Sequence, residues 1–239
     1  MADIETGYYA TVDENFNEAY KLITSEQNHS ELINMLEKGN IVQKQLAALK
    51  LEKINNEKEA QILLNNLTGQ DGKVREAVSL KINEFLHNNA LSSYFNIEKN
   101  YTKFLDSIID INGNICRNII SAISTQINNN EFCDKFCTEL LNRTLNLALI
   151  IKDFDFQDGK YKVNKEVFKL YWYLETIYIF AYQLDFLKLK EILSITKSIN
   201  EYTIREKTAK ILTRDFQDSE TQKIKELLKN DTNYYVRRF

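Results

Sequence analysis

One local pattern that recurs along the sequence constrains the fold more than any other feature. A polar turn residue leads into an apolar residue, an arginine and a stretch with apolar residues at helical spacing. In the most complete copy, 71–86, Asp71 takes the N-cap position and Val74, Val78 and Ile82 share one helical face. Further copies open at Asp110–Arg117, Asn200–Arg205 and Asp231–Arg237, with a weaker copy at Asn40–Lys44. The apolar anchors follow one another at steps of about 32 to 42 residues, apart from one step of about 88, and this range is typical of helical repeats.

A second apolar-periodic stretch follows each of these openings. The second stretches cover 57–67, 97–109, 131–151, 184–195 and 219–228. The long step leaves room for one more opening, which we place near 165–169. The pattern therefore predicts an all-α fold whose units each contain a helix, a short turn and a second helix. Residues 167–186 are apolar nearly all round, which predicts a helix that is buried on most sides.

The composition supports a helical array. Six glycines and no proline are too few turn residues for a β-sandwich or barrel, and a hydrophobic content of 44% is ample for a core. We expect residues 1–39 to cap the array with two helices. The first begins near Asp13 with Phe16, Tyr20 and Ile23 on one side, and the second ends at Gly39.

The openings at Asp71–Arg75 (D-x-x-V-R) and Asp231–Arg237 (D-x-N-x-x-V-R) resemble the start of the first helix in HEAT repeats, most closely the bacterial repeats related to phycobilisome lyases. The resemblance runs from about Asn40 to the end of the chain. It implies one α-solenoid domain over 1–239, an armadillo-like superhelix of about five to six helix pairs, with repeats over 40–151 and 164–239. It also implies that acidic residues and arginines form a ladder between neighbouring repeats. The ladder residues would be Asp71, Arg75, Arg117, Arg205 and Arg237.

The segment 152–163 departs from the helical pattern. Apolar and polar residues alternate on both sides of Asp158-Gly159, which is the strongest short signal for a β-hairpin. We therefore predict a small hairpin insertion near 154–163, between the two sets of repeats.

Charge and cysteine content set expectations for location and partners. The net charge is -3, divided into -6 over residues 1–150 and +3 over 151–239, so a modest basic half could contact phosphate or an acidic protein. Three cysteines and an N-terminus without a signal-like apolar region indicate a cytoplasmic protein. No apolar run approaches the length of a membrane span, so we expect no membrane partner.

Candidate binding residues cluster in the aromatic segment and the basic segment after it. Trp172, Glu175 and Tyr178 are neighbours at helical spacing, and a carboxylate beside aromatic rings could cradle a base. In the alternative interpretation, which we favour, the rings are core and Glu175 pairs with a lysine. The other candidates are Asp185, Lys207, Lys210 and Arg214, of which the last three form a basic strip that is usually a solvated face. The repeated arginines could also be a phosphate-binding row, although a ladder explains their recurrence better.

The sequence indicates no catalytic residue, metal site or cofactor. Cys133 and Cys137 share a helical face, but their spacing and the distant histidines do not match a zinc site, so we expect buried thiols. The function that a helical repeat favours is a non-enzymatic scaffold or adaptor that binds a protein or peptide on its concave face, which second helices usually line. Two alternatives stay open. One is a nucleic-acid-binding protein or a DNA-glycosylase-like repair enzyme, and the other is a regulatory or lyase-accessory protein.

Overall fold

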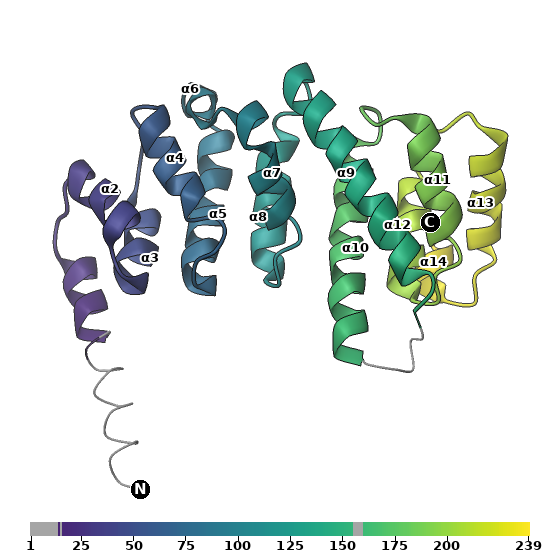
Figure 1. Cartoon of the computed structure of the whole chain (residues 1–239), viewed down its shortest axis with the longest axis horizontal. Helices are drawn as coiled ribbons and strands as arrows, with labels where there is room; N and C mark the ends of the chain where they lie inside the picture. The colour runs from purple at the N-terminus through teal and green to yellow at the C-terminus, as the bar shows by residue number, and fades with distance from the viewer. Residues whose placement is uncertain (1–13, 15, 155–159) are drawn as a thin grey trace, which may run out of the picture. The chain divides into compact units, whose positions relative to one another are not determined.

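The computed structural model confirms the all-α fold class throughout the part of the chain that it describes (Figure 1). The described residues are 14, 16–154 and 160–239, with side chains for all of them except 160–164. The helices form two compact units, one ending at Ile97 and the other beginning at Glu98. None of the described helices combines the length and the apolar character that crossing a membrane requires.

Unit 1 consists of helix pairs in two layers. Its elements are the helical residues 16–24, α2 (His29–Lys38), α3 (Ile41–Lys50), α4 (Glu57–Asn65), α5 (Gly72–Leu86), the short α6 (Asn89–Ser92) and a 3-10 turn, η1 (Ser93–Phe95). In sequence order α2 packs on α3 and α4 on α5. Across the pairs, α3 packs on α5 and α2 on α4, so alternate helices belong to the same layer.

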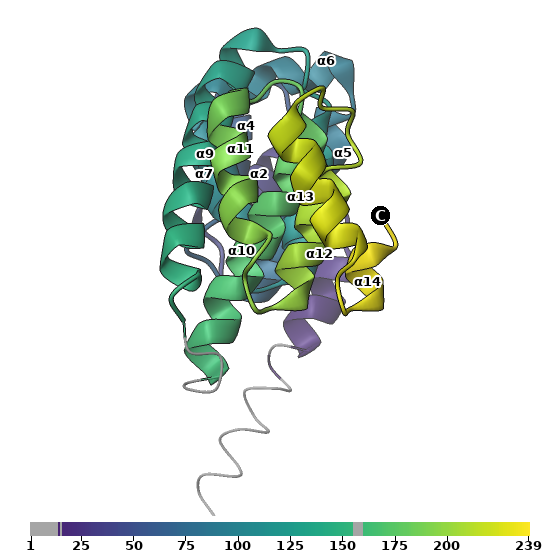
Figure 2. The same cartoon turned by 90° about the vertical axis from the view of Figure 1, so that its right-hand side faces the viewer.

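Unit 2 repeats this two-layer arrangement. Its helices are α7 (Ile97–Ser107), α8 (Gly113–Ser124), α9 (Asn130–Ile151), α10 (Lys160–Phe180), α11 (Phe186–Thr196), α12 (Tyr202–Ile211), α13 (Ser219–Lys229) and α14 (Tyr234–Arg237). The first helices of the predicted pairs pack in the order α8, α10, α12, α14, and the second helices α9, α11 and α13 pack in the same way. Figure 2 views the end of this unit that α13 and α14 form. The predicted missing copy near 165–169 thus exists as α10.

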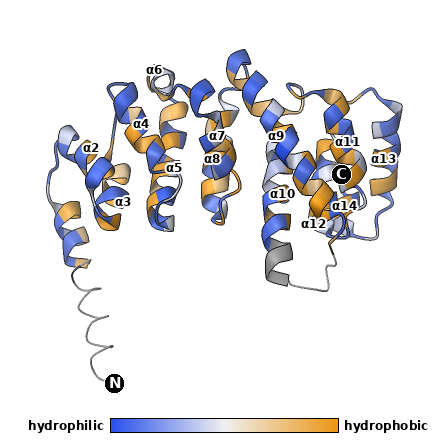
Figure 3. Cartoon of the chain, in the orientation of Figure 1, coloured by the Kyte–Doolittle hydropathy of each residue, from blue (hydrophilic) through white to orange (hydrophobic). Residues whose placement is uncertain are grey.

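Aromatic residues hold the layers of unit 2 together. The rings of Phe132 and Phe136 of α9 stack with their centres 4.9 Å apart, and the ring centre of Phe180 of α10 lies 5.3 Å from that of Phe136. Phe104 of α7 meets Phe132 edge-on at 6.5 Å. All four side chains are fully buried. Apolar and polar residues alternate along each helix in Figure 3, because one side of a helix meets its neighbours and the other meets water.

Asparagine begins many of these helices. Seven of the described helices have an asparagine at the N-cap whose side chain accepts a backbone N–H of the first turn. At Asn28 and Asn40 the third helical residue also returns a side-chain bond, which completes a capping box. Because asparagine is one of the best N-cap residues, it marks helix starts in this proline-free chain. Asn129, in the polar run before α9, is one of these caps.

The sequence led us to expect that residues 16–24 would cover the array with their apolar stripe. In the structure this stripe is exposed. Phe16, Tyr20 and Ile23 are 69%, 61% and 60% exposed. Polar contacts attach the segment instead. Glu18 accepts hydrogen bonds from Asn40 and Gln43 at the start of α3. The apolar side of this helix therefore faces away from α3.

The predicted second strand of the β-hairpin is wrong, because the structure has a helix there. Residues 160–163 form the first turn of α10, and the turn residues 155–159 lie outside the described residues. Alternation over four residues is too short to distinguish a strand from a helix, and the apolar-periodic sequence after it extends the helix backwards. The predicted helix over 167–186 also ends early, because α10 stops at Phe180 and the Asp185 side chain starts α11 by accepting the backbone N–H of Lys188.

The repeated arginines bind the turns that precede their helices. Arg205 donates to the carbonyls of Ile199 and Asn200 at 2.8 and 2.9 Å, and Arg237 donates to Thr232 at 2.9 Å. Arg75 donates in the same way to Gln70. Because these carbonyls lie five or six residues before the arginine, each side chain fixes the entry of the chain into its helix.

Arg205 also connects two successive repeats. Its Nε and Nη2 atoms donate to Asp231 at 2.7 and 3.3 Å, a two-pronged ion pair between α12 and the turn before α14. The pair lowers the pKa of Asp231. Asp71 serves as the N-cap of α5, and Arg117 binds Asn114 within α8 at 2.6 Å. The full ladder stays a prediction, with Arg205–Asp231 as the rung whose geometry is defined here.

Removing an aromatic ring from the centre of unit 2 should cost far more stability than removing an exposed ring. Phe136→Ala should lower the free energy of unfolding by about 3 to 5 kcal/mol, because it leaves a cavity beside Phe132 and Phe180. Phe16→Ala, at an exposed site, should change it by less than about 0.5 kcal/mol. Urea titrations followed by circular dichroism measure both values, and equal effects would contradict this assignment of the core.

Arg205→Ala should lower the stability of unit 2 by about 2 kcal/mol, because it removes the ion pair with Asp231 and the bonds to two carbonyls. Lys223→Ala, at an exposed position of α13, is the matched control and should have little effect. Thermal melting of the two variants side by side tests the rung. A melting temperature for Arg205→Ala equal to that of the control would remove its structural role.

Candidate functional site

Six of the seven predicted binding residues come together on α10, on α12 and in the turn that follows α12. Glu175 of α10 binds two lysines of α12, since Lys207 Nζ lies 2.7 Å from Oε2 and Lys210 Nζ lies 2.6 Å from Oε1. The predicted basic strip therefore faces α10, and Lys207 is only 8% exposed rather than solvated. The favoured interpretation of Glu175 as the partner of a lysine agrees with this geometry.

Tyrosine rings of α10 line the other side of the basic strip. Lys207 Nζ lies 4.2 Å from the centre of the Tyr171 ring, and Lys210 Nζ lies 4.5 Å from that of Tyr178. The Arg214 guanidinium stacks on Tyr178 at 4.1 Å and donates through Nε to the Tyr178 carbonyl at 3.2 Å. We call Tyr171, Glu175, Tyr178, Lys207, Lys210 and Arg214 the α10–α12 cluster. A cation that lies over an aromatic ring is attracted to the ring face and still carries a positive charge that can attract an anion.

The charges of the α10–α12 cluster stabilise one another. Burial raises the pKa of Glu175, but the hydrogen bonds from Lys207 and Lys210 outweigh burial, and the net shift is downward. Burial likewise lowers the pKa of Lys207, while the bond to Glu175 and the contact with Tyr171 outweigh it, and the net shift is upward. The acid and the base are therefore both ionised at neutral pH.

A surface pocket of about 330 Å³ lies beside the cluster. Three helices line it, with Arg117, Ile120 and Ser121 from α8, Tyr171, Trp172, Glu175 and Ile179 from α10, and Lys207 from α12. Trp172 is 7% exposed, and its indole N–H is buried without a hydrogen-bond partner among the described residues. We call this the α8–α12 pocket. It combines apolar walls with cations, which suits a ligand that is partly apolar and negatively charged.

The remaining predicted residues lie elsewhere or have other roles. Asp185 caps α11 and takes no part in the α10–α12 cluster. Cys133 and Cys137 are buried free thiols, as expected, and burial raises the pKa of Cys137 to about 12. Among the described residues there is no group of three or more His, Cys, Asp or Glu side chains placed to hold a metal ion.

Sequence reasoning missed the contribution of α8 to the pocket. Arg117 and Ser121 are four residues apart, so their shared helical face could have been found from spacing. Nothing in the sequence, however, indicated that this face of α8 meets Trp172. Sequence reasoning also expected second helices to line the binding face, whereas every residue of the α8–α12 pocket belongs to a first helix.

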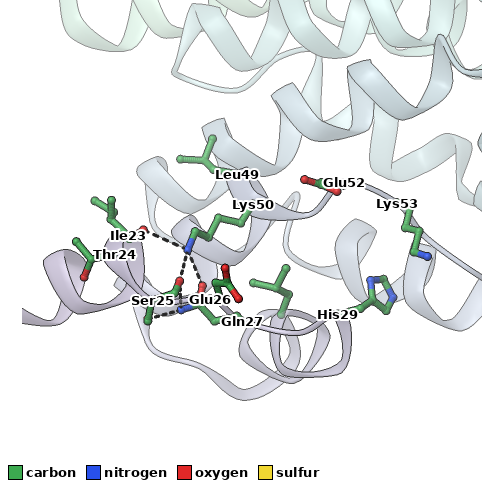
Figure 4. A pocket seen from close by; sticks show the side chains of 11 residues that line it. Ile23, Thr24, Ser25, Glu26, Gln27, His29, Leu49, Lys50, Glu52 and Lys53 are labelled. Carbon is green, nitrogen blue, oxygen red and sulfur yellow. Dashed lines mark hydrogen bonds between the residues drawn. The ribbon is translucent and has the colours of Figure 1, made fainter.

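Unit 1 contains a larger pocket of about 640 Å³, in which Lys50, Gln27 and His29 have structural partners (Figure 4). Lys50 donates to the carbonyls of Leu22 and Ser25 at 2.6 and 2.9 Å and to the Gln27 side chain at 2.7 Å, so it closes the C-terminal end of the helical residues 16–24. His29, at the opposite side of the view, lies 2.9 Å from Glu59. These contacts connect neighbouring helices of unit 1.

Comparison with known proteins adds little to this description. No protein-family model matches the chain. No curated protein matches it either. Among solved structures, a designed armadillo repeat protein is similar, with a TM-score of 0.44 and 14% identity over 88% of this chain and 96% of that one.

Glu175→Gln should lower the free energy of unfolding by about 2 kcal/mol at neutral pH, because two lysines lose their shared carboxylate. The folded pKa of Glu175 is lowered, so its contribution is present above its unfolded pKa and is lost as the pH falls through the folded value. The difference between wild type and variant should therefore shrink below about pH 4.

The matched control for this variant is Glu226→Gln, which breaks an exposed pair with Lys229 on α13. It should change stability by less than about 0.5 kcal/mol. Urea unfolding at several pH values measures both variants. If Glu175→Gln were as stable as this control at neutral pH, Glu175 would not hold α10 and α12 together.

Proposed function

We propose that the chain is a protein-binding scaffold whose contact surface is the face of unit 2 formed by the first helices α8, α10, α12 and α14. The α10–α12 cluster is the observation that carries this proposal. Tyrosine, tryptophan and arginine are the residues that most often dominate protein interfaces, because they combine large area with directional contacts. Here they are collected on adjacent first helices, beside a pocket.

The same composition continues toward α14. The ring centre of Tyr202 of α12 lies 6.2 Å from that of Tyr235, which in turn lies 5.7 Å from the ring centre of Tyr234. These three rings are all exposed. Arg238 lies 5.5 Å from the Tyr235 ring and pairs with Glu206 at 2.6 Å. A partner could therefore contact aromatic rings and cations along successive repeats, as scaffolds of stacked helices allow.

A nucleic-acid-binding role is the second candidate, because cations interleaved with aromatic rings can also hold bases and phosphates. Two features favour a protein. The chain carries a net charge of -3 and its residues 151–239 only +3, which is a weak attraction for a polyanion. Both oxygens of Glu175 are bound by lysines, so the carboxylate that a glycosylase-like mechanism would use is occupied. A cytoplasmic bacterial scaffold of the HEAT-repeat type remains our proposal for the chain as a whole.

Site-specific photo-crosslinking tests this surface. A benzophenone amino acid replaces one residue at a time. Two test positions are Tyr182, next to the α10–α12 cluster, and Tyr235 on α14. Two further positions, Leu187 on α11 and Leu227 on α13, lie on second helices. All four positions are exposed, so they differ mainly in the face that they report. After irradiation in native lysate treated with nuclease, we expect a discrete protein adduct from the first two positions.

The second-helix positions are the matched controls for background. Adducts of equal strength from Leu187 and Leu227 would reject the assignment of the face. A parallel sample is irradiated without nuclease. Crosslinks to nucleic acid in that sample, with no protein adduct in either sample, would contradict the scaffold proposal and support nucleic-acid binding.

A further inference from the structure

We propose that the α8–α12 pocket binds an acidic side chain of a peptide segment, with Arg117 and Lys207 as the cations that hold its carboxylate. This inference rests on the proposed scaffold function and specifies the chemistry of the partner. It depends on three properties of the pocket, which are uncompensated positive charge, a buried donor without a partner, and partial desolvation.

Positive charge around the pocket exceeds what the local carboxylate can neutralise. Lys207 and Lys210 share the single carboxylate of Glu175. Arg214 stacks on Tyr178 and donates to a carbonyl, and Arg117 binds the neutral amide of Asn114. Among the described ion pairs, neither arginine has a carboxylate partner. Of the charged residues that line the pocket, Arg117 and Lys207 are positive and Glu175 is negative, while Lys210 and Arg214 add positive charge beside it.

Arg117 and the Trp172 ring approach the same point beside Gly113. A Cβ atom at Gly113 would lie 3.5 Å from Cζ2 of Trp172 and 3.7 Å from Nη1 of Arg117. The Cζ2 atom lies two bonds from the indole nitrogen, whose N–H has no hydrogen-bond partner among the described residues. A buried donor without an acceptor is costly, so a carboxylate oxygen that reached this N–H would relieve that cost.

The pocket suits a single acidic side chain better than a phosphate backbone. Lys207 is mostly buried and already holds Glu175, and Ile120 and Ile179 provide apolar walls. A guanidinium fork matches a carboxylate, and the low local polarity strengthens the contact. A polyanion would instead need a row of solvated cations.

The intrinsic fluorescence of Trp172 tests this inference directly, because it is the only tryptophan of the chain. The full chain is titrated with a synthetic peptide that alternates Glu with Ala, with a matched peptide that has Gln for Glu, and with an oligothymidylate. We expect a saturable change in emission with the Glu peptide and little change with the Gln peptide. Arg117→Gln should weaken binding of the Glu peptide about tenfold.

Lys223→Gln, which removes an exposed cation from α13, is the matched charge control and should leave binding within about twofold. Equal responses to the Glu and Gln peptides, or unchanged binding by Arg117→Gln, would overturn the acidic-peptide assignment. A stronger response to oligothymidylate would overturn it in favour of nucleic acid. Protein adducts at Tyr182 or Tyr235 without a Glu-peptide response would sink this inference and leave the scaffold intact, whereas absence of adducts would fail the scaffold itself.

Discussion

The structure depends on the burial of apolar helix faces between two layers. No single helix of this chain can remove its apolar side from water, so each helix is stable only against its neighbours. In unit 2 the stacked rings of Phe132, Phe136 and Phe180 show how this burial connects a second helix with the next first helix. The polar devices are secondary to it. Asparagine caps and arginine–carbonyl bonds decide where helices begin, while apolar contact decides that they stack.

The α10–α12 cluster follows from the same stacking. Because first helices pack on first helices, α10 and α12 lie side by side. Glu175 then bridges two lysines, and the tyrosines supply the surface on which the cations lie. Each charge of the α10–α12 cluster is held by a partner or a ring. A preformed surface of this kind lowers the entropy that a partner must lose on binding.

The sequence predicted most of the fold and part of the site. The recurrent openings located the other first helices, because an N-cap followed by an apolar stripe is a local signal, and the long step between two openings located α10. The hairpin prediction failed in its second strand because four alternating residues carry too little information against a longer helical pattern. The members of the α10–α12 cluster were named from their spacing on each helix. Their mutual contacts, the burial of Lys207 and the role of Arg117 in the pocket could not be inferred, because they depend on which helices become neighbours.

By itself the sequence determined the helical class, the order of helix pairs and the residues that share each helical face, since these depend on local periodicity and on capping within a few residues. The tertiary structure decided which faces meet. It made Glu175 a bridge between α10 and α12, placed Trp172 in the lining of a pocket that α8 completes, and left the Phe16 side of the first described helix exposed. The physical reason is that packing couples residues far apart in the chain, and no local pattern encodes that coupling.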